Sequence, residues 1–298
     1  LVLEGADGLI VGRDDRPLLN DRHLAPLEWS ENDRPLGVYL VQPEPATAPG
    51  RYTLKMAVYD PTTLAPLPAA GESSLGGFAT LGQVTLTRAA TPAPEATLPL
   101  EIRLPFSWRG LRLLGRGPLP AEALPGGALA LDLYWRAETG GLPDLAAYLE
   151  LEPAEGGPAA AWESPVAGGY STLEWVAGET VRGHARLRLE PGLPPGDYRL
   201  RLRLIDGSDG GQSPAVDLGP VTVAGRPHHF DPPAAMGHRL EVRFGKFARL
   251  LGFDYTLDPG QTLTLTLYWQ AEDASATPYA VSAQLLDASG ALRAQCDQ

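Results

Sequence analysis

The sequence predicts an all-β protein built from repeated antiparallel sandwiches, and three observations lead to this prediction. Apolar residues alternate with polar ones over many short segments, which is the pattern of strands with one buried face. Several of these segments recur in the same order at a fixed spacing. Glycine and proline, with 34 and 30 residues among 298, supply the many turns that short strands need.

One repeat links the middle of the chain to its last third. Residues 129–138 (LALDLYWRAE) match residues 263–272 (LTLTLYWQAE) at an offset of 134 residues, from Trp135 to Trp269. In both segments the leucines point to one side and the series ends at the tryptophan. We therefore expect Trp135 and Trp269 to lie in the core.

A second repeat links the first third of the chain to the middle. Residues 49–60 parallel residues 195–206 at an offset of 146, and both segments begin with Pro-Gly-x-Tyr before an apolar strand. In immunoglobulin-like sandwiches such a tyrosine packs its ring in the core and bonds its hydroxyl to nearby backbone, which is the tyrosine corner. This role is predicted for Tyr52 and Tyr198. Trp29 and Trp175 recur at the same offset, which favours a structural role for them.

The repeats divide the chain into one complete unit and two partial ones. Residues 98–224 are predicted to form a complete immunoglobulin-like antiparallel sandwich. Residues 1–90 correspond to the later part of a preceding repeat, and residues 238–298 to the earlier part of a following one. Together the terminal parts contain every strand of the repeat, with one hairpin duplicated. We expect them to complete one composite sandwich, within a chain or by strand exchange between chains; alternatively, residues 1–90 fold alone.

The charge of the chain bears on its partners. Asp and Glu outnumber Lys and Arg by 36 to 24, which gives a net charge of −12. Binding to nucleic acid depends on clustered cations that release counterions from phosphates, so no nucleic-acid partner is expected. No apolar run reaches the ~18 residues of a membrane span, so this chain is not expected to insert into a membrane. It begins at Leu1 within an expected strand, and we interpret it as a fragment of a larger protein.

Motifs for catalysis and metal binding are absent from the sequence. It has no HExxH, no Gly-x-Ser-x-Gly and no GxxxxGK[ST], and its one cysteine, Cys296, has no evident base. His184 lies in an expected strand with arginines nearby, whereas His228 and His229 lie in a proline-rich linker over 225–235. We therefore expect no catalytic residue, no metal and no cofactor. The loop 206–211 (DGSDGG) could hold Ca²⁺, but turn chemistry is the favoured interpretation.

Exposed aromatic rings are the remaining candidates for ligand contact, because sugars stack on them. Trp108 and Trp162 have no tryptophan counterpart in the other repeats, and Tyr134 and Tyr268 are expected on the outward side of their strands. These four residues are the candidate ligand-binding residues. The alternative is that they are partly exposed packing residues.

The repeat resembles a known family. The pattern Pro-Gly-x-x-Leu-x-Leu-x-Leu-Tyr-Trp, the segment Leu-Leu-Asp-Ala-Ser-Gly and the pattern Leu-x-Pro-Gly-x-Tyr-x-Leu carry the resemblance, in residues 124–135, 258–269, 285–290 and 193–200. They are similar to the β-sandwich repeats that follow the membrane region of bacterial glycosyltransferases of the protein O-mannosyltransferase type. The resemblance implies an extracytoplasmic or cell-surface location and contact with a glycan or a cell-envelope component. It transfers no catalytic residue, because that family's catalytic carboxylates lie in membrane-proximal loops.

The expected function is therefore a non-catalytic structural or binding module of a larger membrane-associated, glycosyltransferase-like protein. One alternative is a free-standing carbohydrate-binding or adhesion module. A weaker alternative is a hydrolase on a sandwich scaffold.

Overall fold

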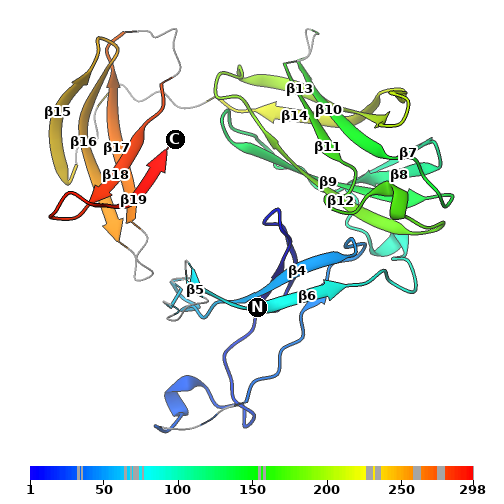
Figure 1. Ribbon diagram of the computed structural model, residues 1–298, viewed down its shortest axis with the longest axis horizontal. Coiled ribbons are helices and arrows are strands. Elements are labelled where there is room, and N and C mark those ends of the chain that lie inside the picture. The colour runs from blue at the N-terminus through cyan, green and yellow to red at the C-terminus, as the bar shows by residue number, and fades with distance from the viewer. Residues whose placement is uncertain are drawn as a thin grey trace. The chain divides into compact units, whose positions relative to one another are not determined.

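The computed structural model describes residues 1–31, 34, 36–63, 66–67, 69, 74–75, 77–153, 156, 159–225, 231, 236–257, 263–273 and 279–297. The chain forms two compact units, Leu1–Pro227 and His228–Gln298. The described residues form antiparallel strands together with short 3-10 turns (Figure 1). The all-β prediction is confirmed. The division into one complete and two partial repeats stays a prediction.

The central sandwich lies in the first unit and consists of two four-stranded sheets. One has the order β12-β9-β8-β7 and the other β11-β10-β13-β14, and all their pairings are antiparallel. The first sheet contains β7 (Ile102–Trp108), β8 (Leu111–Arg116), β9 (Ala128–Ala137) and β12 (Thr180–Arg188). The second contains β10 (Leu145–Pro153), β11 (Ala160–Pro165), β13 (Gly196–Asp206) and β14 (Val216–Val223).

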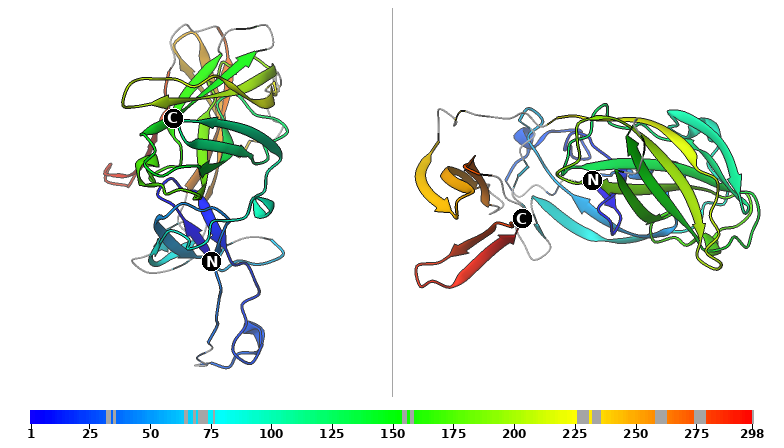
Figure 2. Two further views of the ribbon diagram at one scale, coloured as in Figure 1. Left: turned by 90° about the vertical axis from the view of Figure 1, so that its right-hand side faces the viewer. Right: turned by 90° about the horizontal axis from the view of Figure 1, so that it is seen from above.

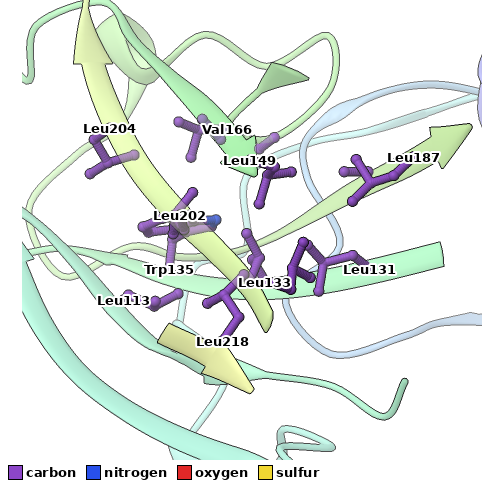
Figure 3. Close-up of a cluster of buried hydrophobic side chains, with 14 of the residues drawn as sticks. Leu113, Leu131, Leu133, Trp135, Leu149, Val166, Leu187, Leu202, Leu204 and Leu218 are labelled. Carbon is purple, nitrogen blue, oxygen red and sulfur yellow. The ribbon is translucent and has the colours of Figure 1, made fainter. Parts of the chain in front are cut away.

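The core of this sandwich is formed by the inward residues of both sheets. Leu131 and Trp135 of β9 are fully buried together with Leu149 of β10 and Leu202 of β13. Figure 3 shows these side chains meeting between the sheets. The prediction of Trp135 as a core residue is confirmed, because strict alternation puts every second residue of β9 on the inner face.

Both predicted tyrosine corners are present. The hydroxyl of Tyr52 donates to the carbonyl oxygen of Ala48 at 2.8 Å, and that of Tyr198 donates to Pro194 at 2.8 Å. In each case the acceptor lies four residues before the tyrosine. The Pro-Gly turn thus brings the chain back so that the hydroxyl, at the polar end of a packed ring, finds a backbone partner.

Residues 1–90 contribute a separate sheet to the same unit. Its strand order is β3-β2-β1-β4-β6-β5. The central pair β4–β6 has a bulge after Leu54, and the pair β13–β14 has a bulge after Leu200, which is the same position at the offset of 146. The strands are β1 (Val2–Glu4), β2 (Ile10–Arg13), β3 (Gln42–Pro43), β4 (Gly50–Met56), β5 (Ser74–Leu75) and β6 (Phe78–Leu86).

The second unit contains a three-stranded sheet and a hairpin among its described residues. The sheet has the order β15-β16-β17, and β18 pairs with β19. In Figure 2 the red hairpin forms a ribbon of its own beside the yellow-to-orange strands. The strands are β15 (His238–Phe244), β16 (Ala248–Leu257), β17 (Leu263–Ala271), β18 (Ser282–Leu286) and β19 (Leu292–Asp297).

The prediction that Trp269 lies in the core is wrong. Its side chain is 40% exposed, and its ring meets Phe244 edge-on at 5.2 Å between centroids. Trp135, its counterpart, is covered by the four strands of a second sheet. Among the described strands of the second unit, β15–β17 form a single layer without such a four-stranded partner.

Candidate functional site

Trp108 lies at the end of β7, where its ring face is occupied. The guanidinium carbon of the next residue, Arg109, lies 4.7 Å from the ring centroid, which is the geometry of a cation–π contact. The rest of the side chain packs partly against the core. The indole face that was expected to meet a ligand is thus taken by a neighbouring side chain.

The DGSDGG loop after β13 holds this arginine. Arg109 forms ion pairs with Asp206 and with Asp209, the latter at 2.8 Å. Asp206 also accepts hydrogen bonds from the backbone N–H and the hydroxyl of Ser208. Hydrogen bonds from Ser208, and then the arginine, hold the pKa of Asp206 below its ordinary value. Both carboxylates are therefore engaged in turn chemistry and one cation, which agrees with the favoured interpretation of this loop.

Trp162 and Tyr268 are partly buried and hydrogen-bonded. The indole N–H of Trp162 donates to the carbonyl oxygen of Arg188 at 3.0 Å, and its ring packs against the central core. The hydroxyl of Tyr268 donates to Asp254 at 2.7 Å. Trp162 lies in β11 of the first unit, and Tyr268 lies in β17 of the second.

Tyr134 contradicts the expectation of an outward, accessible ring. It does point away from the sandwich core, but it is only 1% exposed. It packs with Leu98 and Leu114 in a small second cluster, which Ala46 and Ala93 also contact. Burial raises the pKa of its hydroxyl to about 12. The outer side of β9 is covered by the chain around residues 93–100 and by the loop at Ala46, so Tyr134 is a packing residue.

A cleft lies where residues 1–90 meet the central sandwich. Its volume is about 380 Å³. The lining comes from β2, β4 and the loops before them in residues 1–90, and from β12 and the loop after β11 in the central sandwich, so both parts of the first unit contribute. The lining consists of residues 5–7, 9, 11, 47–52 and 167–170, together with Arg182 and His184.

Arg182 is the central side chain of this joint. Its guanidinium forms an ion pair with Glu44 and a second one with Asp132 at 3.0 Å, and its side chain is only 9% exposed. Its backbone N–H donates to the carbonyl oxygen of Ala46 at 2.7 Å. A buried cation needs paired charges around it, and here one carboxylate comes from each part of the unit.

His184 lies next to this arginine on the same side of β12. Its Nδ1 lies 2.7 Å from a carboxylate oxygen of Asp132, directly across the strand pair β12–β9. Burial alone raises the pKa of Asp132, but the hydrogen bonds from His184 and Arg182 outweigh it and hold that pKa below its ordinary value. The carboxylate therefore stays ionised and orients both cation-forming side chains.

An aspartate–histidine pair can act as a general base when a nucleophile is within reach. The hydroxyls that line the cleft are instead engaged: Thr47 donates to Glu44, and Tyr52 donates to Ala48. No serine or cysteine occurs in the described lining. The arrangement can hold polar groups of a ligand by hydrogen bonds, but it lacks the nucleophile of a catalytic triad.

A second contact closes the same joint from another side. Arg88, which follows β6, forms an ion pair with Glu179 at 3.2 Å and donates to the hydroxyl of Tyr170 at 2.8 Å. The ring of Tyr170 stacks at 5.9 Å on that of Trp175, which is buried. The joint therefore rests on two arginines, one from each side of the boundary.

Sequence reasoning missed most of this site. His184 with Arg182 beside it was noticed, but their partners lie 52 and 138 residues away. One signal was available: Asp132 is the acidic residue between two core leucines, in a strand whose other outward residues are two alanines, a tyrosine and an arginine. The pairing of β9 with β12 was needed to connect that signal with the histidine.

The described part of the chain carries neither a metal-binding cluster nor a membrane-spanning helix. No group of three or more His, Cys, Asp or Glu residues there is arranged to hold a metal ion. No helix there is long and apolar enough to cross a membrane. His228 and His229, and Pro259-Gly260 before β17, lie outside the described residues.

Comparison with known proteins shows no family. No family model matches the chain, and no curated protein matches it. Among solved structures, the C-terminal domain of wzt is 11% identical with a TM-score of 0.33, over 42% of this chain and 80% of that one. An alkylpurine DNA glycosylase AlkC from Pseudomonas fluorescens, bound to DNA containing an abasic site analog, is 13% identical with a TM-score of 0.28, over 40% of this chain and 32% of that one.

A β-glucosidase from Listeria innocua in complex with glucose is 16% identical with a TM-score of 0.26, over 39% of this chain and 16% of that one. The chain thus spans a third or less of the two enzymes. Likenesses this weak carry no argument about function.

Proposed function

We propose that this chain is a non-catalytic structural and binding module, located outside the cytoplasm as an accessory part of a larger membrane-associated, glycosyltransferase-like protein. The buried joint at Arg182 carries the proposal. A structural module that holds a partner at a fixed distance needs parts that do not move independently of one another. Interfaces within a chain permit domain motion by default unless they are well packed. Here Arg182, whose side chain is 9% exposed, joins the two parts through an ion pair with Glu44 and a backbone hydrogen bond to Ala46.

The chemistry of the cleft supports the non-catalytic part of the proposal. The Asp132–His184 pair has no serine or cysteine beside it among the described residues, and the cleft's hydroxyls bond to the protein. A hydrolase would need a nucleophile, or two carboxylates placed on either side of a bond.

The rigidity of the joint can be measured by spin labelling. With Cys296→Ser as background, we place nitroxide labels at exposed Thr85 and Glu122, one in each part of the first unit. We expect a narrow distance distribution from pulsed electron resonance, and a broadened one when Arg182→Ala is added. A broad distribution in the chain with arginine would contradict the proposed spacer.

The location is tested separately. The reading frame that encodes this chain should also encode several membrane spans, and an alkaline phosphatase fused after residue 224 should be active only outside the cytoplasm. An active fusion protein with no membrane spans in the frame would favour the free-standing module instead.

The cleft favours carbohydrate binding as a second candidate. It combines a histidine, the carboxylate of Asp7 and the ring of Tyr52, which are group types that hold sugars through hydrogen bonds and ring contact. A glycan array compares the parent chain with His184→Ala, and with Arg186→Ala, a matched exposed position of β12 outside the cleft. Loss of a signal only with His184→Ala supports binding there; loss only with Trp108→Ala or Trp162→Ala assigns it to those residues.

A further inference from the structure

Strand β17 has an open edge where its counterpart has a partner. In the central sandwich, β9 lies between β8 and β12. Strand β17 carries the same LYW sequence and pairs with β16, the counterpart of β8, through a bulge at the equivalent place. On its other side no described strand pairs with it. The edge therefore presents free backbone donors and acceptors to a further strand.

The inner face of β17 is also uncovered. Leu131 and Trp135 of β9 are 0% exposed, whereas the corresponding Leu265 and Trp269 are 39% and 40% exposed. Apolar side chains of this kind stabilise a protein when they leave water, at about 25 cal/mol per Å². A leucine face with an aromatic end that stays in contact with water is thus the surface of a sandwich that lacks its second sheet.

The first 90 residues contain the counterparts of what β17 lacks. Residues 36–41 correspond to residues 182–187 of β12 at the offset of 146, so that Gly37 matches Gly183 and Val41 matches Leu187. In the structure residues 36–41 belong to no strand. The counterpart of β12 therefore exists in the sequence and pairs with no β9-like strand.

The sheet of residues 1–90 shows the complementary exposed face. Val84 of β6 is 37% exposed, whereas its counterpart Val221 of β14 is 3% exposed beneath the opposite sheet. Leu54 of β4 is half-buried, whereas Leu200 of β13 is fully buried. These two strands thus correspond to the sheet that would face β15–β17.

We propose that two copies of the chain complete each other. Residues 36–41 of one copy pair antiparallel with the open edge of β17 in the other, and the β4–β6 sheet packs on the apolar face of β15–β17. The occupant is a second copy because the two halves of one chain are separated in sequence by the complete central sandwich, and residues 1–90 are already joined to that sandwich through Arg182. Each chain carries both halves, so the exchange is reciprocal and closes a symmetric pair.

The hairpin β18–β19 is not part of this composite sandwich. In the central sandwich, β10 of the hairpin β10–β11 lies beside β13. In residues 1–90 the position beside β4, the counterpart of β13, is already held by β1. Of the two hairpins that repeat the β10–β11 hairpin, the composite sandwich thus contains β1–β2 and does not contain β18–β19.

The proposal fixes a register that can be tested by cross-linking. Ala130 of β9 lies opposite Arg186 of β12, and the two offsets convert this pair into Thr264 and Leu40. Directly opposed residues of an antiparallel pair have Cβ atoms about 4.5–5.5 Å apart, which is close enough for a disulfide after small adjustment.

The experiment uses two full-length chains of different mass on a Cys296→Ser background. One carries Leu40→Cys and the other Thr264→Cys. They are mixed, unfolded, refolded together and oxidised. We expect a covalent heterodimer in a denaturing gel, and a concentration-dependent dimer of the parent chain in sedimentation. The control replaces Thr264→Cys by Gln270→Cys, which lies six residues along the same strand, about 20 Å away, and should cross-link at least ten-fold less.

Two results would overturn the proposal. One is a heterodimer yield no higher than that of the Gln270→Cys control, together with a monomer at every concentration. The other is an internal disulfide in the double variant Leu40→Cys/Thr264→Cys that forms equally fast at any dilution, since it would mean that the halves meet within one chain.

Discussion

The hydroxyls of Tyr52 and Tyr198 each make one hydrogen bond to a carbonyl four residues back. A single hydrogen bond of this kind contributes about 1 kcal/mol to the free energy of unfolding. We expect Tyr198→Phe to lower that free energy by about 1 kcal/mol in chemical denaturation followed by fluorescence. Tyr148→Phe is the control, because Tyr148 lies on the outward, half-exposed side of β10; an equal loss in both variants would argue against the corner.

Asp132 predicts how acid affects the protein. Its pKa in the folded chain lies below the ordinary 3.8, because the hydrogen bonds from His184 and Arg182 outweigh the effect of burial. A lowered pKa contributes stability that is complete above the unfolded pKa and is lost as the pH falls through the folded one. Denaturation midpoints should therefore fall below about pH 4, and less steeply in Asp132→Asn. If the midpoints of the parent chain and of Asp132→Asn fall equally steeply with pH, Asp132 does not contribute to the acid sensitivity.

At the level of strands, the close pairing of β8 with β7 depends on a glycine. A Cβ at Gly115 would lie 2.1 Å from the carbonyl oxygen of Ile102, and one at Gly252 would lie 2.4 Å from that of His238. The backbones approach too closely for any side chain, so the strand would have to shift. We expect Gly115→Ala to destabilise the central sandwich by about 2–3 kcal/mol, measured by thermal unfolding. Gly192→Ala, with open space around it, should be nearly neutral.

Strand β9 shows how far sequence alone can go. Alternation predicted its inner face correctly, down to the burial of Trp135, because period two is a local property of an extended chain. The same alternation placed Tyr134 outward but could not show that residues 93–100 cover it. For Trp269 the local pattern was the same as in β9, and the result differed because burial depends on what lies opposite. Local order was predictable from the sequence; coverage by distant segments was not.

At the scale of the whole first unit, the joint between residues 1–90 and the central sandwich depends on Arg182. Removing one partner of a buried ion pair leaves uncompensated charge and costs about 3 kcal/mol. We expect this loss in the unfolding free energy of Arg182→Ala. Arg199→Ala, which removes an exposed pair with Asp217, should change stability by less than about 1 kcal/mol. Equal losses of unfolding free energy in the two variants would mean that the ion pairs of Arg182 stabilise the protein no more than an exposed pair does.

The candidate site was harder to predict than the fold, because its contacts join segments that are distant in the sequence. Its residues come from segments that are far apart in the sequence, such as Glu44 and Arg182. The four aromatic candidates were chosen by local features, and the structure shows their faces or polar atoms engaged by neighbouring groups. No periodicity in the sequence points to a contact between two repeats.

A joint held by ion pairs, such as the one at Arg182, responds to salt and pH differently from a joint held by apolar contacts. The guanidinium of Arg182 is 9% exposed, but the carboxylate of Glu44 across the joint is 51% exposed, so dissolved salt can screen this ion pair. The backbone hydrogen bond from Arg182 to Ala46 does not depend on ionic strength in this way. Acid acts differently, because protons neutralise the carboxylates that pair with Arg182 and so remove the ion pairs themselves. At strongly acidic pH we therefore expect residues 1–90 to move independently of the central sandwich.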